Sequence, residues 1–212
     1  MPPCRLIIFD FDGTLADSFG WFLDTFDTIA DRFDFKRLDR SRIEDFRHLD
    51  ARELMRLHGV PLWKVPMIAA HARTLQSHNL DTIKLFDGMA QVVAELHAKG
   101  IVIAVVTSNA RANVETVLGT DLTTRIDHFA CGASLFGKVG KFKALLQSLD
   151  LKPHDALAIG DELRDIEAAR AAGIKAGTVA WGYTAPERLM AEKPDYLFET
   201  PADITALFQI AP

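Results

Sequence analysis

Uninterrupted apolar runs mark the strands around which the chain is expected to build its core. They are "LIIF" (6–9), "IVIAVV" (101–106), "ALAIG" (156–160) and "AGTVAWG" (176–182). A strand that is apolar at consecutive positions is buried on both faces, as in a parallel sheet. Segments with helical periodicity lie between these runs, at 88–100, 141–149 and 165–173. Strands that alternate with helices predict a doubly wound α/β sheet.

The segment from 16 to 85 has a different pattern, because its apolar residues recur at helical spacing and no strong strand appears. In "FGWFLDTFDTIADRF" (19–33) the stripe runs from Phe19 to Phe33, and Ser18 precedes it as a reasonable N-cap. "IEDFRHLDARELMRLHG" and "WKVPMIAAHARTLQSHNL" are also helical in pattern. We therefore expect a core formed by residues 1–15 and 86–212, with a helical insertion at 16–85.

Composition and charge narrow the class of protein. The 212 residues are 49% hydrophobic and 25% charged, which is typical of a globular domain, and the formal net charge is -5. Without a basic block, the chain is not expected to bind nucleic acid. Cys4 and Cys131 form no redox-like or metal-like pair. No signal-peptide pattern or membrane-length apolar run appears, so we expect a cytoplasmic protein with no membrane partner. The oligomeric state, monomer or homodimer, stays open.

Polar side chains follow the predicted strands at the points where these strands end. They are Asp10 and Asp12 after the first run, Thr107 and Ser108 after the second, and Asp161 after the third, with Lys138 and Lys141 in the expected loop before a later helix. In open α/β sheets, ligands bind outside the carboxyl ends of the strands. These residues are therefore predicted to converge on one site.

Asp10 and Asp12 are two positions apart, and residues i and i+2 of an extended chain point to the same side. Two carboxylates facing one spot repel each other unless a cation or a proton relieves the repulsion. Hard oxygen ligands favour Mg²⁺ for that role. Asp161 supplies a further carboxylate, Asp165 follows one helical turn later, and Glu162 is an additional candidate.

This set of groups suits phosphoryl transfer, which mainly needs charge neutralisation and in-line positioning. Lys138 or Lys141 and the Thr107 hydroxyl would hold an anion opposite the metal. A carboxylate can itself act as the nucleophile and form an aspartyl-phosphate. A second carboxylate can then protonate the leaving oxygen and later accept a proton from water.

At these residues the chain resembles the haloacid-dehalogenase superfamily of phosphatases. "DFDGTLADS" (10–18) is similar to the first motif of that family, which implies Asp10 as nucleophile and Asp12 as general acid/base. "IGDELRDIEAARAAG" (159–173) is similar to the fourth motif. The resemblance implies a Mg²⁺ site formed by Asp10, Asp12, Asp161 and Asp165. Glu162 is a departure, because many relatives have a small hydroxyl residue there.

The second and third motifs are weaker. "VVTSN" (105–109) resembles the second, which implies that the hydroxyl of Thr107 binds phosphate. "FGKVGK" (136–141) resembles the third but lacks the proline-rich turn of many relatives, and of its two lysines we prefer Lys138 because Lys141 is expected to begin the next helix. Further phosphate-binding candidates are Gly13, Thr14, Ser108, Asn109 and Lys141.

The resemblance also implies a Rossmann-like core and a role for the helical insertion as a cap over the substrate. "VAWGY" (179–183) is similar to the phosphoglycolate-phosphatase-like branch. Within the expected cap, Arg47 and His48 are the pair to examine for substrate contact.

Three functions compete. The first is a Mg²⁺-dependent phosphatase acting on a small phosphorylated metabolite, with phosphoglycolate as the guess from resemblance. The second is a sugar-phosphate mutase of the same superfamily, which would have to keep water from the aspartyl-phosphate; dehalogenation is less favoured, since it needs no metal set. The third is a non-catalytic module that binds a phosphorylated ligand, because fold alone does not fix function.

Overall fold

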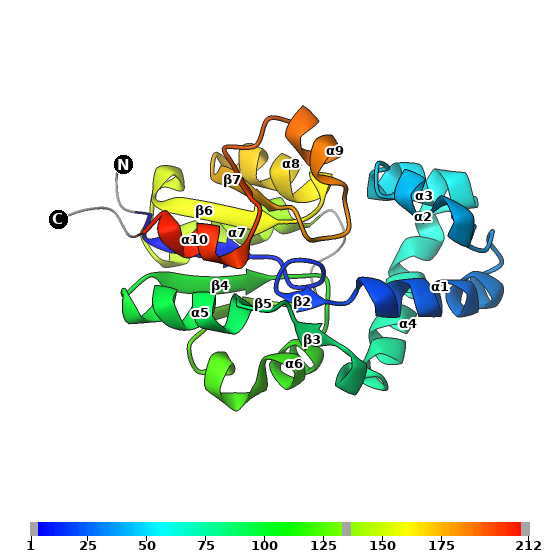
Figure 1. Cartoon of the computed structure of the whole chain (residues 1–212), viewed down its shortest axis with the longest axis horizontal. Helices are drawn as coiled ribbons and strands as arrows, with labels where there is room; N and C mark the ends of the chain where they lie inside the picture. Colours follow the sequence, from blue (N-terminus) through cyan, green and yellow to red (C-terminus); the bar gives the residue numbers. More distant parts are fainter. Residues whose placement is uncertain (1–3, 133–136, 209–212) are drawn as a thin grey trace.

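A six-stranded parallel sheet forms the centre of the described part of the chain, residues 4–132 and 137–208, in this computed structural model (Figure 1). The strand order is β5-β4-β1-β6-β7-β8, and each neighbouring pair runs parallel. The strands are β1 (Leu6–Phe9), β4 (Val102–Val106), β5 (His128–Ala130), β6 (Ala156–Gly160), β7 (Lys175–Val179) and β8 (Tyr196–Phe198).

β1 lies inside the sheet, between β4 and β6, and this position explains its sequence. Leu6 and Ile8 pack into one hydrophobic layer, whereas Ile7 and Phe9 pack into the layer on the opposite face. All four side chains are buried. A strand buried on both faces needs apolar residues at every position, which is what the run "LIIF" provides.

Helices cover both faces of the sheet, so the predicted doubly wound α/β class is confirmed. On the face of Ile7 and Phe9 lie α5 (Met89–Ala98), α6 (Arg111–Thr123) and α10 (Pro201–Ala206). On the face of Leu6 and Ile8 lie α7 (Lys138–Ser148), α8 (Leu163–Ala172) and α9 (Pro186–Ala191), and a short turn η4 (Pro153–Asp155) precedes β6. α8 ends as predicted at Gly173, whose φ of 74° places it in the left-handed region.

The chain between β2 (Ala16–Asp17) and β3 (Lys84–Leu85) is helical, and these two short strands pair antiparallel at its base. We call residues 18–83 the helical insertion. It contains α1 (Phe19–Phe33), α2 (Ile43–Phe46), α3 (Ala51–His58) and α4 (Val65–Ser77), with the turns η1 (Arg40–Arg42), η2 (Leu62–Lys64) and η3 (Leu80–Thr82). In Figure 1 the insertion lies at the right, beyond the ends toward which the strand arrows point.

Three local expectations differ from the structure. Ser18 makes no side-chain cap for α1, because its hydroxyl is hydrogen-bonded to Tyr183 Oη at 2.9 Å. Lys138 and Lys141 do not lie in a loop, since α7 already begins at Lys138. The edge strands β5 and β8 were not expected, because each has three residues and no fully apolar buried run.

Candidate active site

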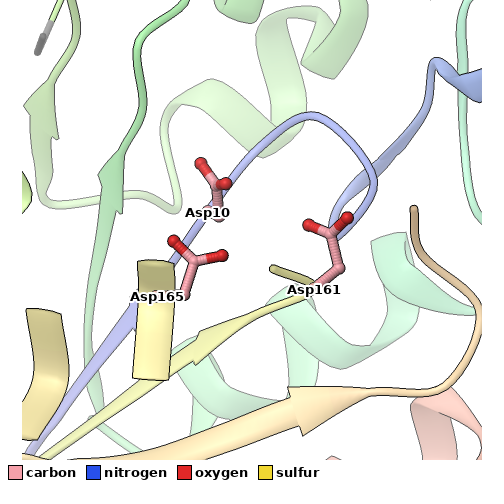
Figure 2. Close-up of side chains that lie close together, drawn as sticks. All are labelled: Asp10, Asp161 and Asp165. Carbon is pink, nitrogen blue, oxygen red and sulfur yellow. The ribbon is translucent and has the colours of Figure 1, made fainter. Parts of the chain in front are cut away.

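Three carboxylates come together at the carboxyl end of the sheet (Figure 2). Asp10 follows β1, Asp161 follows the neighbouring strand β6, and Asp165 lies in the first turn of α8. One oxygen of each lies within 4.8 Å of one oxygen of the other two, and all three residues are buried. We call this group the acidic triad. Parallel neighbours bring their carboxyl ends to one edge, so the convergence predicted for these three residues is observed.

Lys138 joins the acidic triad from the first position of α7. Its Nζ lies 2.7 Å from Asp10 Oδ2 and 2.5 Å from Asp165 Oδ1, and its side chain is only 4% exposed. Lys141, one turn further along α7, is exposed to solvent. The structure therefore brings Lys138 to the triad and leaves Lys141 at the surface. Phe136, the first residue of the quoted third motif, lies outside the described residues.

The Asp161 carboxylate is held by groups from two loops. It accepts hydrogen bonds from Thr14 Oγ1 at 2.8 Å and from the Tyr183 backbone N–H at 2.9 Å. Gly13 and Gly182 pack so closely on Asp161 that a Cβ at either position would collide with it. Gly13 and Thr14 were predicted to contact phosphate, and the structure places both against this carboxylate.

Burial and the neighbouring charges shift the pKa values of the three triad carboxyls. Burial raises the pKa of Asp10 to about 6, although the Lys138 ammonium offsets part of that rise. Burial and the neighbouring carboxylates raise the pKa of Asp161 well above its ordinary value. Burial also acts against ionisation of Asp165, but Lys138 and Arg164 outweigh it and lower the pKa of that carboxyl. Three buried carboxyl groups whose oxygens converge suit a bound cation, and an all-oxygen donor set fits Mg²⁺.

The carboxylate of Asp12 is bound by two amide groups and is not a member of the acidic triad, and its sharing of one site with Asp10 stays a prediction. Among the described residues, the group of converging acids contains Asp10 but not Asp12. β1 ends at Phe9, and Asp12, three residues later, forms an isolated β-bridge with Ala16. Its Oδ1 accepts from Gln76 Nε2 and its Oδ2 from Asn109 Nδ2, each at 2.9 Å.

The residues after β4 lie beside Asp12. Thr107 is buried, and its Oγ1 accepts a hydrogen bond from the Asn109 backbone N–H at 3.0 Å. The Ser108 carbonyl accepts from Arg73 Nη1 of α4 at 3.2 Å. This segment thus contacts both the turn after β1 and the helical insertion.

Arg47 and His48 have different surroundings. The Arg47 guanidinium donates to the carbonyl oxygens of Gly182 and Tyr183 at 3.1 and 3.2 Å, which joins the insertion to the loop after β7. His48 is exposed and does not line the cavity beside the site. Glu162 is neither a triad member nor simply solvated, because its Oε1 lies 2.5 Å from Arg164 Nη2.

Sequence reasoning missed Gln76 and Arg73, which both reach the core from α4. The position of Gln76 could have identified it from the sequence. Gln76 is four residues after Ala72, so it is a polar residue in the inward-facing stripe of this helix. A polar residue in an apolar stripe needs a hydrogen-bond partner, and here the partner is Asp12.

The fold and the site together define a hydrolase of known type. The family model for haloacid dehalogenase-like hydrolases matches residues 7–179, so the chain belongs to this family. The predicted class, a haloacid dehalogenase-like phosphatase, is confirmed at the level of the family.

Curated relatives cover nearly the whole chain. A phosphoglycolate phosphatase from Synechococcus elongatus is 30% identical over 94% of this chain and 95% of its own length. Pyrophosphatase PpaX from Bacillus cereus (strain B4264) is 26% identical over 93% of each chain. The resemblance to the phosphoglycolate-phosphatase-like branch is thereby confirmed.

Solved structures share the fold. A haloacid dehalogenase-like family hydrolase from Streptococcus pneumoniae superposes with a TM-score of 0.79 at 20% identity, covering 99% of this chain and 100% of the other. CbbY from Rhodobacter sphaeroides, solved with phosphate, gives 0.68 at 23% identity, covering 95% and 96%. Within the described ranges, no helix has the length and apolar character needed to span a membrane.

Proposed function

We propose that the protein is a Mg²⁺-dependent phosphatase that hydrolyses a small phosphorylated metabolite through an aspartyl-phosphate on Asp10. The observation that carries this proposal is the buried acidic triad with Lys138 in contact with two of its members. Asp10, Asp161 and Asp165 would hold the metal. When bound, Mg²⁺ neutralises charge on the phosphoryl oxygens.

In the first proposed step, a carboxylate oxygen of Asp10 attacks phosphorus and the bond from phosphorus to the ester oxygen breaks. Asp12 gives a proton to the leaving oxygen, so the alcohol departs neutral. In the second step, water attacks the phosphorus of the aspartyl-phosphate and Asp12 accepts a proton from that water. Inorganic phosphate leaves, and both aspartates return to their starting forms.

The hydrogen bonds around the site support these roles. Gln76 and Asn109 orient the Asp12 carboxylate, one from the insertion and one from the core. Thr107 Oγ1 accepts a bond from the Asn109 backbone N–H, which leaves its own proton for a phosphoryl oxygen. Lys138 contacts the attacking carboxylate of Asp10 and would also favour negative charge on the phosphoryl group.

Phosphate release from a panel of metabolites, with Mg²⁺ or with EDTA, tests the proposal. The panel includes phosphoglycolate because a relative has that activity in its name. We expect release that is lost with EDTA and in Asp10→Asn. Undiminished release by a purified Asp10→Asn protein would refute the aspartyl-phosphate route, whereas conversion of a hexose 1-phosphate to the 6-phosphate without net release would favour a mutase.

A further inference from the structure

A cavity of about 320 Å³ lies between the helices of the insertion and reaches the site at Asp12 and Asn109. α1 contributes Phe19, Phe22 and Phe26 to its wall, a stripe at helical spacing. This volume is within the range of pockets that hold drug-sized ligands. The cavity is therefore much larger than a two-carbon phosphate ester needs.

α3 and α4 present stripes of the same kind to this cavity. They are Ala51, Leu54, Met55 and His58 from α3, and Ile68, Ala69, Ala72 and Gln76 from α4. Apolar stripes at this spacing normally meet in a close-packed core, where voids larger than a water molecule are few. Here they line a hollow instead, and an apolar hollow favours an apolar occupant.

The cationic side chains of the wall are already engaged with the protein. Arg47 donates to the carbonyl oxygens of Gly182 and Tyr183, and Arg73 donates to that of Ser108. Arg164, the third cation of the wall, lies 2.5 Å from Glu162 Oε1. The wall that the insertion forms around Phe26 is otherwise rich in carbon side chains. This arrangement suits an uncharged group better than the carboxylate of phosphoglycolate.

His58 is a polar residue within this apolar wall, and both of its ring nitrogens are turned into the protein. It is 4% exposed, and its Nδ1 lies 2.8 Å from the Lys36 carbonyl oxygen, so Nδ1 carries a proton. Its Nε2 is buried without a hydrogen-bond partner in the described structure, and in the neutral ring it is an acceptor. The ring packs edge-on against Phe26 and Phe46, with centroids 4.8 and 5.6 Å away. Because Nε2 has almost no accessible surface, an occupant of the cavity cannot reach it, and His58 contributes to the wall through the packing of its ring.

We propose that the substrate is a phosphomonoester whose alcohol part is an apolar, ring-sized body. This body fills the cavity, and the phosphate lies at the end that Asp12 and Asn109 line. This inference rests on the proposed phosphatase function and adds the substrate class to it.

Steady-state kinetics with naphthyl phosphate and phosphoglycolate test the inference. We expect kcat/KM for naphthyl phosphate to exceed that for phosphoglycolate by at least about 10-fold.

Two variants test the contribution of the cavity. Ala72→Phe fills the cavity and should lower kcat/KM for naphthyl phosphate at least about 10-fold more than kcat/KM for phosphoglycolate. Ala70→Phe is the matched control, because Ala70 is on the same helix but is exposed and does not line the cavity. If the Ala72→Phe protein does not fold, Ala69→Leu is the substitute, because it adds a smaller side chain to the same cavity wall.

Calorimetric binding of naphthylmethylphosphonate, which cannot be hydrolysed, separates failure of this inference from failure of the phosphatase proposal. Binding to the wild type that Ala72→Phe weakens and Ala70→Phe does not supports the inference even if no ester is turned over. Absence of binding overturns it, whatever the activity. Phosphate release with phosphoglycolate as the best substrate, unchanged by Ala72→Phe, also overturns it and leaves the phosphatase proposal intact.

Discussion

Replacing Lys138 with methionine removes the ammonium that contacts the acidic triad and keeps most of the side-chain volume. Nζ lies 2.7 Å from Asp10 and 2.5 Å from Asp165, and all three side chains are at most 6% exposed. Removing one partner of a buried ion pair costs about 3–5 kcal/mol, because the remaining charge has no compensation. We expect that loss of unfolding free energy, equivalent to a fall in Tm of roughly 6–20 °C for a chain of this size.

The loss of unfolding free energy in Lys138→Met should depend on pH, and the pKa of Asp10 determines whether it grows or shrinks as the pH rises. That pKa is already raised to about 6, and without Lys138 it rises further, because the ammonium lowers it in the wild type. A carboxyl whose pKa is higher in the folded than in the unfolded state adds stability at pH values below the unfolded pKa, which is about 4. That contribution is lost as the pH rises through the pKa of the folded state. Lys138→Met should therefore lose more stability at pH 8 than at pH 5.

Urea unfolding followed by circular dichroism, in EDTA at both pH values, measures these losses. Lys141→Met is the control, because Lys141 lies one turn along α7 and is exposed, and we expect a change within about 0.5 kcal/mol. A loss below about 1 kcal/mol at pH 8, or an equal loss in the control, would refute the reasoning that the buried ion pair carries the effect.

Three further outcomes test the surroundings of Asp161. Thr14→Val removes the hydroxyl that donates to Asp161, and should raise the Mg²⁺ concentration for half-maximal activity about 10- to 100-fold in a metal titration. Gly13→Ala should lower Tm more than Gly100→Ala in thermal unfolding, because both glycines have positive φ but only a Cβ at position 13 meets Asp161. Mg²⁺ at 100 times its Kd should stabilise the EDTA-treated protein by about 2.7 kcal/mol, and this gain should be lost in Asp161→Asn.

The sequence is most informative where burial is uniform. β1, β4 and β6 are central strands, so their residues are apolar almost without interruption, and their ends locate Asp10 and Asp161. Periodicity cannot identify β5 and β8, because these edge strands are short and half-buried.

Local sequence patterns cannot predict the contacts that residues of the site make with segments far away in the sequence. Asp12 receives one hydrogen bond from Gln76 in the insertion and one from Asn109 in the core, at separations of 64 and 97 residues. Both bonds exist together only when the insertion lies against the core. We therefore expect the orientation of Asp12 to depend on the same closed arrangement that encloses the cavity. Proton transfer needs an oriented carboxylate. The same movement of the insertion that closes over the substrate would therefore also orient Asp12 for proton transfer.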